Sequence, residues 1–191
     1  MFGIEKRRTY NALRKHISDY FPNHPIHEHK WNDGPIAKIL PRFSILEVAP
    51  GPKNSLWTYF SLGAWEVKHK DSGTLEFMLV TPERDKQHFL SLAMTAFYHV
   101  SNPLGVGHTF PIGEPWLEGS NCDHMLVSRP YVYSPELEVC NLSNQHVHFL
   151  WLLPITKAER DYKSKYGLEA LEKIFEESEV EYWKIARESL V

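Results

Sequence analysis

The densest group of side chains that could bind a metal or transfer a proton is the segment His24-Pro25-Ile26-His27-Glu28-His29. Imidazoles at short spacing are typical zinc ligands, and Asp33 lies close enough in sequence to add a carboxylate. The segment matches neither the His-Glu-x-x-His helix pattern nor a cysteine-pair site. A proline-broken segment rich in histidine is more often solvated surface, and we favour that interpretation. A metal-dependent hydrolase that uses these histidines together with His108 is the alternative hypothesis.

A second candidate for chemistry is His108, which follows Gly105 and Gly107 and is followed by Ser120 and Asp123. A general base needs an orienting carboxylate and a nucleophile within hydrogen-bond reach. Ser120 lacks the Gly-x-Ser-x-Gly turn that exposes a hydrolase nucleophile. We therefore expect His108 to hydrogen-bond to the backbone of its loop, and the sequence predicts no catalytic residue.

Cys122 and Cys140 are the only cysteines, and they lack both a CxxC partner and a local cationic cluster, so a structural role is expected. The Gly105-Val106-Gly107 segment has no third glycine and no strand directly before it, and no Gly-Lys-Ser/Thr occurs. The sequence therefore predicts no nucleotide, metal or other cofactor.

Large aromatic side chains are the best candidates for contact with a partner protein, because Trp and Tyr are over-represented among interface hot spots. Trp57 and Tyr59 share one face of a predicted strand, where core and surface roles are equally supported, and the loop residue Trp116 is expected at the surface. The predicted partner-contact residues are Trp57, Tyr59, Trp65, His108 and Trp116.

The elements that must position these residues follow from periodicity and turn signals. Helices are predicted over 5–21, 84–100 and 179–189, and strands over 43–49, 56–62, 74–80, 124–128, 137–142 and 146–153. The predicted buried stripe of the second helix contains Phe89, Leu92, Ala93, Ala96, Phe97 and Val100. Prolines predict an irregular segment over 22–41, a turn is predicted at 71–73, and Gly and Pro predict a long loop over 101–121.

The clearest local signal lies near the end of the chain. Thr156 and Glu159 have the spacing of a capping box, Gly167 ends the helix that the box begins, and a second amphipathic helix follows from Leu168. Runs of strands separated by single helices favour an α+β fold with a mainly antiparallel, mixed sheet packed with helices. We expect one domain over residues 1–191.

Bulk composition excludes several classes of protein. Hydrophobic residues make up 42% and charged residues 24% of the 191 residues, as in ordinary globular proteins. A net charge of −3 without a basic stripe argues against nucleic-acid binding. No segment approaches the roughly 20 apolar residues that span a bilayer. Two isolated cysteines and the lack of a signal-peptide core predict a cytoplasmic protein.

Several blocks together resemble the suppressor of fused domain family, in matching order over roughly residues 30–180. They are SLWTYFSLGAWE (55–66), EFMLVTPE (76–83), GVGHTF (105–110), HMLVSRP (124–130) and VHFLWLLPITKAERDYKSKYGLEAL (147–171). The last block is the most specific. The resemblance implies a mixed α/β domain with no established enzyme activity, and the length of the chain resembles the bacterial single-domain members.

The resemblance to those bacterial members implies an immunity protein that neutralises a cognate toxin of a polymorphic toxin system. With no catalytic set in the sequence, we expect a non-catalytic protein-binding module whose partner is a protein, neither nucleic acid nor membrane. A regulatory scaffold without a toxin is a further alternative.

Overall fold

The structure, a computed structural model, describes residues 2–69 and 73–191. The chain folds as two compact units. Unit 1 takes in the described parts of residues 1–104 and 129–151, and unit 2 takes in residues 105–128 and 152–191. One long strand, β8 (His146–Thr156), contributes its first part to unit 1 and its second part to unit 2. The expectation of a single domain stays a prediction.

Unit 1 contains the N-terminal helix and most of the strands. Its helices are α1 (Phe2–Tyr20), α2 (Gly34–Ile39), the 3-10 turn η1 (Ala64–Glu66), α3 (Gln87–Ser101) and α4 (Pro135–Glu138). Its strands are β1 (Ile26–Lys30), β2 (Ser44–Val48), β3 (Trp57–Leu62), β4 (Thr74–Thr81), β7 (Val139–Asn141) and the first part of β8.

The strands of unit 1 pair in the order β1-β2-β3-β4-β8, with β7 also on β8. Every pair in this unit is antiparallel except β4 with β8, which runs parallel with Thr74 opposite Val147 and Met78 opposite Trp151. Because alternate residues of a strand point to opposite faces, this register sorts the side chains into two layers. Phe60 and Phe149 contact each other on one face, and Tyr59 contacts α3 on the other.

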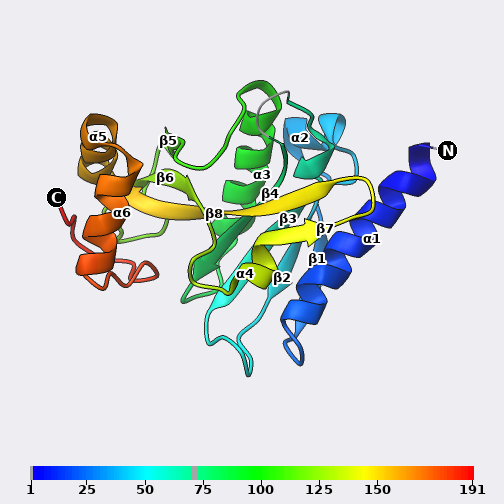
Figure 1. Ribbon diagram of the computed structural model, residues 1–191, viewed down its shortest axis with the longest axis horizontal. Coiled ribbons are helices and arrows are strands. Elements are labelled where there is room, and N and C mark those ends of the chain that lie inside the picture. Colours follow the sequence, from blue (N-terminus) through cyan, green and yellow to red (C-terminus); the bar gives the residue numbers. More distant parts are fainter. Residues whose placement is uncertain (1, 70–72) are drawn as a thin grey trace. The chain divides into compact units, whose positions relative to one another are not determined.

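Helices cover both faces of the unit 1 sheet. On one face α1 lies alongside β7 and reaches β1 and β2, where Tyr10 hydrogen-bonds to Glu28 and Ser44 (Figure 1). On the other face α3 packs against β3 and β4, and α2 packs against α3. The core between these layers is apolar and rich in aromatic rings, including the fully buried Phe60 and Phe77.

Unit 2 contains β5 (Thr109–Pro111), β6 (Cys122–Ser128), the second part of β8, α5 (Lys157–Tyr166) and α6 (Leu168–Glu177). Its strand order is β8-β6-β5, with β5 and β6 antiparallel. The helices α5 and α6 pack on each other, and α5 also packs on β6 (Figure 1). The predicted capping box is confirmed: Thr156 Oγ1 accepts from Glu159 N, and Glu159 accepts from Thr156 N.

The predicted α+β class with a mainly antiparallel, mixed sheet is confirmed, whereas some local predictions are wrong. Residues 22–41 are not wholly irregular, because β1 fits between prolines and Pro35 stands in the first turn of α2, where its missing N–H costs nothing. Residues 179–189 form turns and extended chain, with no helix. The predicted turn at 71–73 lies largely outside the described residues.

Candidate functional site

The most unusual surface of unit 1 is the outward side of α3. Four apolar residues at helical spacing are exposed there, with Met94 59% accessible at the centre; we define Leu90, Met94, Phe97 and Tyr98 as the α3 outer face. The neighbouring helix α2 adds an exposed Ile39. Contiguous exposed apolar side chains are a common mark of an interaction site.

The inward side of the same helix carries polar residues. His88, Ser91, Thr95 and His99 are buried beside Leu92 and Ala96. Ser91 donates to the Gln87 carbonyl at 2.9 Å, and Thr95 donates to the Ser91 carbonyl at 2.8 Å. Because these hydroxyls are satisfied within their own helix, they can face the sheet at little cost and leave the apolar residues outside.

The two buried histidines of α3 are held neutral. Burial lowers the pKa of His88 to about 4, although Asp85 opposes the shift. Burial also lowers the pKa of His99 to about 4, and the nearby His69 adds to the effect. His99 Nδ1 accepts a hydrogen bond from Leu104 N at 3.0 Å, which requires the unprotonated nitrogen. His88 and His99 therefore help to hold α3 against the sheet, and their burial does not suit a general base that must reach a substrate.

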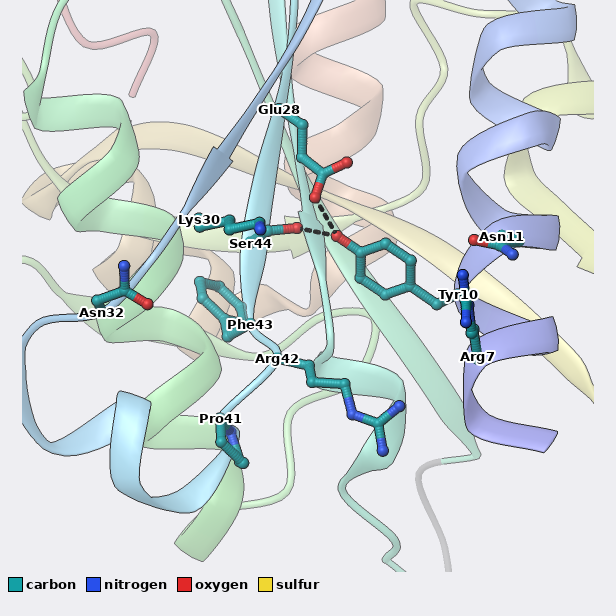
Figure 2. Close-up of a pocket in the computed structure, with 10 residues that line it drawn as sticks. All are labelled: Arg7, Tyr10, Asn11, Glu28, Lys30, Asn32, Pro41, Arg42, Phe43 and Ser44. Atoms are coloured by element: carbon teal, nitrogen blue, oxygen red, sulfur yellow. Dashed lines mark hydrogen bonds between the residues drawn. The ribbon is translucent and has the colours of Figure 1, made fainter. Parts of the chain in front are cut away.

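A second feature of unit 1 is a pocket of about 390 Å³ between α1 and the ends of β1 and β2, here called the Tyr10 pocket. Figure 2 shows Tyr10 reaching from α1 toward Glu28 and Ser44. Tyr10 Oη donates to Glu28 Oε1 at 2.7 Å and also bonds the Ser44 hydroxyl. The pocket is lined by Arg7, Tyr10, Asn11, Glu28, Lys30, Asn32, Pro41, Arg42, Phe43 and Ser44.

Burial raises the pKa of Tyr10 to about 12, and the hydrogen bond to Ser44 opposes this while Glu28 adds to it. The phenol therefore stays protonated at neutral pH and serves as a donor. Glu28 is additionally paired with Arg14, whose Nε lies 3.3 Å from Oε2. Tyr10 thus fixes one wall of the pocket and offers no nucleophile.

A neighbouring pocket of about 610 Å³, here called the Trp31 pocket, shares Lys30 and Asn32 with the Tyr10 pocket. Its other walls include Trp31 and Phe89, and Phe89 directly precedes the α3 outer face along the chain. The Tyr10 pocket and the Trp31 pocket therefore adjoin each other at Lys30 and Asn32.

The three histidines of the metal hypothesis have different surroundings. His24 is buried, with Nδ1 donating to the Ala49 carbonyl at 2.8 Å and Nε2 accepting from Lys53 N at 3.1 Å, so neither nitrogen is available to a metal in this geometry. His27 is exposed on β1, and His29 Nε2 lies 3.5 Å from Glu47. Within residues 2–69 and 73–191, no three His, Cys, Asp or Glu side chains gather as a metal-holding group.

The possible Ser-His-Asp set does not assemble in unit 2. Asp123 bonds to the adjacent His124 at 2.7 Å, and Ser120 Oγ accepts from Cys122 N at 3.1 Å. His108 is exposed, and its backbone N–H and carbonyl bond to Gly105 and Val127. These bonds involve the backbone of His108, so the expected role of its side chain stays a prediction.

The predicted partner-contact residues are placed differently from one another. Trp57 is partly exposed, with the Arg84 guanidinium 5.6 Å from its ring, and His108 is exposed. Tyr59 and Trp65 are buried in unit 1. The expectation that Trp116 lies at the surface is wrong, because the residue is 1% exposed, and its backbone N–H donates to the Cys122 carbonyl. Partner contact by Trp57 and His108 stays a proposal.

Three further groups with raised pKa values are buried inside the protein. Both cysteines are free and buried, and burial raises the pKa of each thiol, which disfavours the reactive thiolate. Burial raises the pKa of Glu76 to about 8, while Ser61 and the backbone N–H of Gly63 donate to it. Glu76 is completely buried and holds the turn after β3.

Sequence reasoning missed Leu90, Met94 and Tyr98 as surface candidates. The signal was present, because residues 90, 94, 97 and 98 form an apolar stripe at helical spacing beside the one taken for the core. No described helix combines the length and apolar character needed to cross a bilayer.

Comparison with known proteins places matches to this chain in one family. Residues 40–188 match the family model described as suppressor of fused protein (SUFU). A curated relative, immunity protein YqcF of Bacillus subtilis (strain 168), is 24% identical over 169 residues, covering 84% of this chain and 86% of YqcF.

Solved structures agree with that family. A SUFU homologue from Neisseria gonorrhoeae FA 1090 has a TM-score of 0.85 and 34% identity, covering 95% of this chain and 96% of its own. A Sufu–Fu complex has a TM-score of 0.67 at 14% identity, covering 95% of this chain and 91% of that one. Drosophila Suppressor of Fused has a TM-score of 0.66 at 14% identity, covering 94% of this chain and 50% of its own. The last two show a shared fold.

Proposed function

The chain belongs to the suppressor of fused family, and on that premise we propose that it is a non-catalytic protein-binding module acting as an immunity protein against a cognate toxin. The similarity to immunity protein YqcF along most of both chains supports the immunity role. The toxin would be a protein of a polymorphic toxin system. The site of action would be the cytoplasm.

The α3 outer face is the observation that carries the binding part of the proposal. Its four side chains lie on the opposite side of the helix from the buried histidines, so a partner could cover them without unfolding α3. Phe97 and Tyr98 are ring side chains of the kind that dominate hot spots, and Met94 adapts its shape to a partner.

The proposal predicts a toxin-like gene beside this gene, and growth of cells that express that toxin tests it. We expect co-expression of the chain to restore growth, and Met94→Asp with Phe97→Asp to abolish the rescue, because a charge would be buried against the toxin. Tyr166→Asp is the matched control, since Tyr166 is an exposed ring on α5 outside the α3 outer face.

Two results would contradict the proposal. One is continued growth arrest with the wild-type chain at normal expression. The other is rescue by a chain that binds no toxin in a parallel affinity purification. Both substituted side chains are exposed, so we expect the double variant to fold, and circular dichroism would verify this.

A further inference from the structure

The Tyr10 pocket carries an imbalance of charge. Arg7 of α1, Lys30 at the end of β1 and Arg42 just before β2 all line it, and all three are exposed. Among the residues that the structure describes, none of these three cations has an ion-pair partner. In a chain with a net charge of −3, three unpaired cations around one concavity create a local positive potential.

The one carboxylate in the pocket does not cancel this charge. Glu28 accepts a hydrogen bond from Tyr10 at 2.7 Å and is paired with Arg14, which is not among the lining residues. Its own charge is therefore already compensated by other groups. The pocket retains the positive charge of Arg7, Lys30 and Arg42.

We propose that the Tyr10 pocket binds carboxylate side chains from an acidic segment of the protein partner. This inference rests on the proposed function, since it names the chemistry of the partner. Arg7 and Arg42 can each grip a carboxylate with two N–H donors, and the amides of Asn11 and Asn32 add further donors. The aliphatic part of a Glu side chain would lie against the Phe43 and Tyr10 rings that line the pocket.

The neighbouring Trp31 pocket adds a second feature that the partner segment must have. It shares Lys30 and Asn32 with the Tyr10 pocket, and Trp31 and Phe89 give it an aromatic lining. A partner segment that fits both pockets has acidic residues next to a large apolar residue. Peptide segments commonly bind through such a combination of a charged contact and an apolar anchor.

A titration followed by NMR tests this inference with a short oligo-glutamate peptide as the probe and an oligo-glutamine peptide of equal length as its control. We expect the glutamate peptide to shift the Tyr10 ring and the amides of residues 42–44, and added salt to weaken binding. Arg7→Glu with Arg42→Glu should weaken binding roughly tenfold or more, because two attractive charges become repulsive.

Arg8→Glu is the matched control, since Arg8 also lies on α1 but lines a different pocket, beside Leu142 and Asn144. It should change the affinity less than about twofold. If the double variant does not fold, Arg7→Gln with Arg42→Gln removes the charges without reversing them, and binding should still fall.

Three outcomes would overturn the inference: equal shifts with oligo-glutamine, unchanged affinity in the double variant, or tighter binding of a single-stranded oligonucleotide than of oligo-glutamate. The peptide titration needs no toxin. Failure here therefore leaves the immunity proposal standing, whereas a toxin that never binds the chain would remove that proposal without changing the titration.

Discussion

At the residue scale, the His24 ring leaves no room for a side chain on Gly51 in the turn after β2. A Cβ atom on residue 51 would lie 2.7 Å from His24 Nδ1, and the ring cannot retreat because both its nitrogens are hydrogen-bonded to the backbone. His24, one of the three histidines of the metal hypothesis, therefore stabilises a turn.

We expect Gly51→Ala to lower the free energy of unfolding by about 1–3 kcal/mol, the usual cost of overpacking. Urea denaturation of the purified protein measures it. Gly105→Ala is the control, because no atom lies within 4 Å of a Cβ placed there and its backbone needs no left-handed conformation. Equal stability of the two variants would show that the His24 ring can move.

Single residues also show where sequence reasoning reaches its limit. The spacing of Thr156 and Glu159 predicts their mutual hydrogen bonds because both partners lie within one turn of the chain. The burial of Trp116 could not be predicted in this way. It depends on residues distant in sequence folding around an otherwise irregular loop, and a Gly-Pro-rich sequence carries no periodic signal for that.

At the scale of elements, the main error of the sequence predictions concerns the buried stripe of α3. The predicted core stripe included Phe97, whereas the helix turns Ser91, Thr95 and His99 inward and exposes Phe97. A hydropathy pattern ranks these three polar residues as surface. Hydrogen bonds within the helix satisfy the two hydroxyls, and His99 Nδ1 accepts from Leu104 N, so the expected penalty for burial is reduced.

The buried histidines make α3 sensitive to acid. Their folded pKa values, about 4, lie below the unfolded value near 6.5, so the unfolded chain binds more protons between these limits. The contribution of these two histidines to the free energy of unfolding is therefore fully present above about pH 6.5. It should fall by a few kcal/mol as the pH drops toward 4.

Urea midpoints across this pH range measure the effect. His99→Asn keeps an acceptor for the Leu104 N–H while removing one titrating group, so it should flatten the dependence on pH. His146→Gln, at an exposed strand position, should leave it as it is. A wild-type chain equally stable at both ends of the range would contradict this account of α3.

The last segment of unit 2 lacks the predicted helix because its side chains bond elsewhere. Arg187 donates to both carboxylate oxygens of Glu159 and, at 2.9 Å, to the Pro154 carbonyl, while Leu190 N also reaches Glu159 at 3.3 Å. These contacts join residues about thirty positions apart. Helix propensity within 179–189 cannot report them, and the contacts override it.

Glu159 thus serves both the capping box and the Arg187 pair. We expect Glu159→Gln to cost about 3–5 kcal/mol, because it leaves a buried guanidinium without its counter-charge. Thr156→Ala removes the cap and the hydrogen bond from Thr156 Oγ1 to Ser189 Oγ, and should cost about 1–2 kcal/mol. Denaturant unfolding compares them, and a Glu159→Gln variant no less stable than Thr156→Ala would contradict a structural role for the ion pair.

At the scale of the whole molecule, the sequence predicted the fold class and the family, because the strand and helix signals are local and their order is distinctive. The surfaces were not predictable to the same degree. The α3 outer face depends on how one helix is rotated against the sheet, and the Tyr10 pocket gathers residues from α1, β1 and β2. Under the proposed function, the α3 outer face would supply an apolar contact and the Tyr10 pocket a charged one.

The most direct test of the central claim is a calorimetric titration of the purified chain with the cognate toxin domain that the proposed function predicts. The account predicts saturable binding that Met94→Asp with Phe97→Asp weakens by roughly a hundredfold or more, as expected for the loss of two hot-spot contacts, while Tyr166→Asp binds like the wild type. No heat of binding to the wild-type chain, or equal affinity of the double variant, would contradict it.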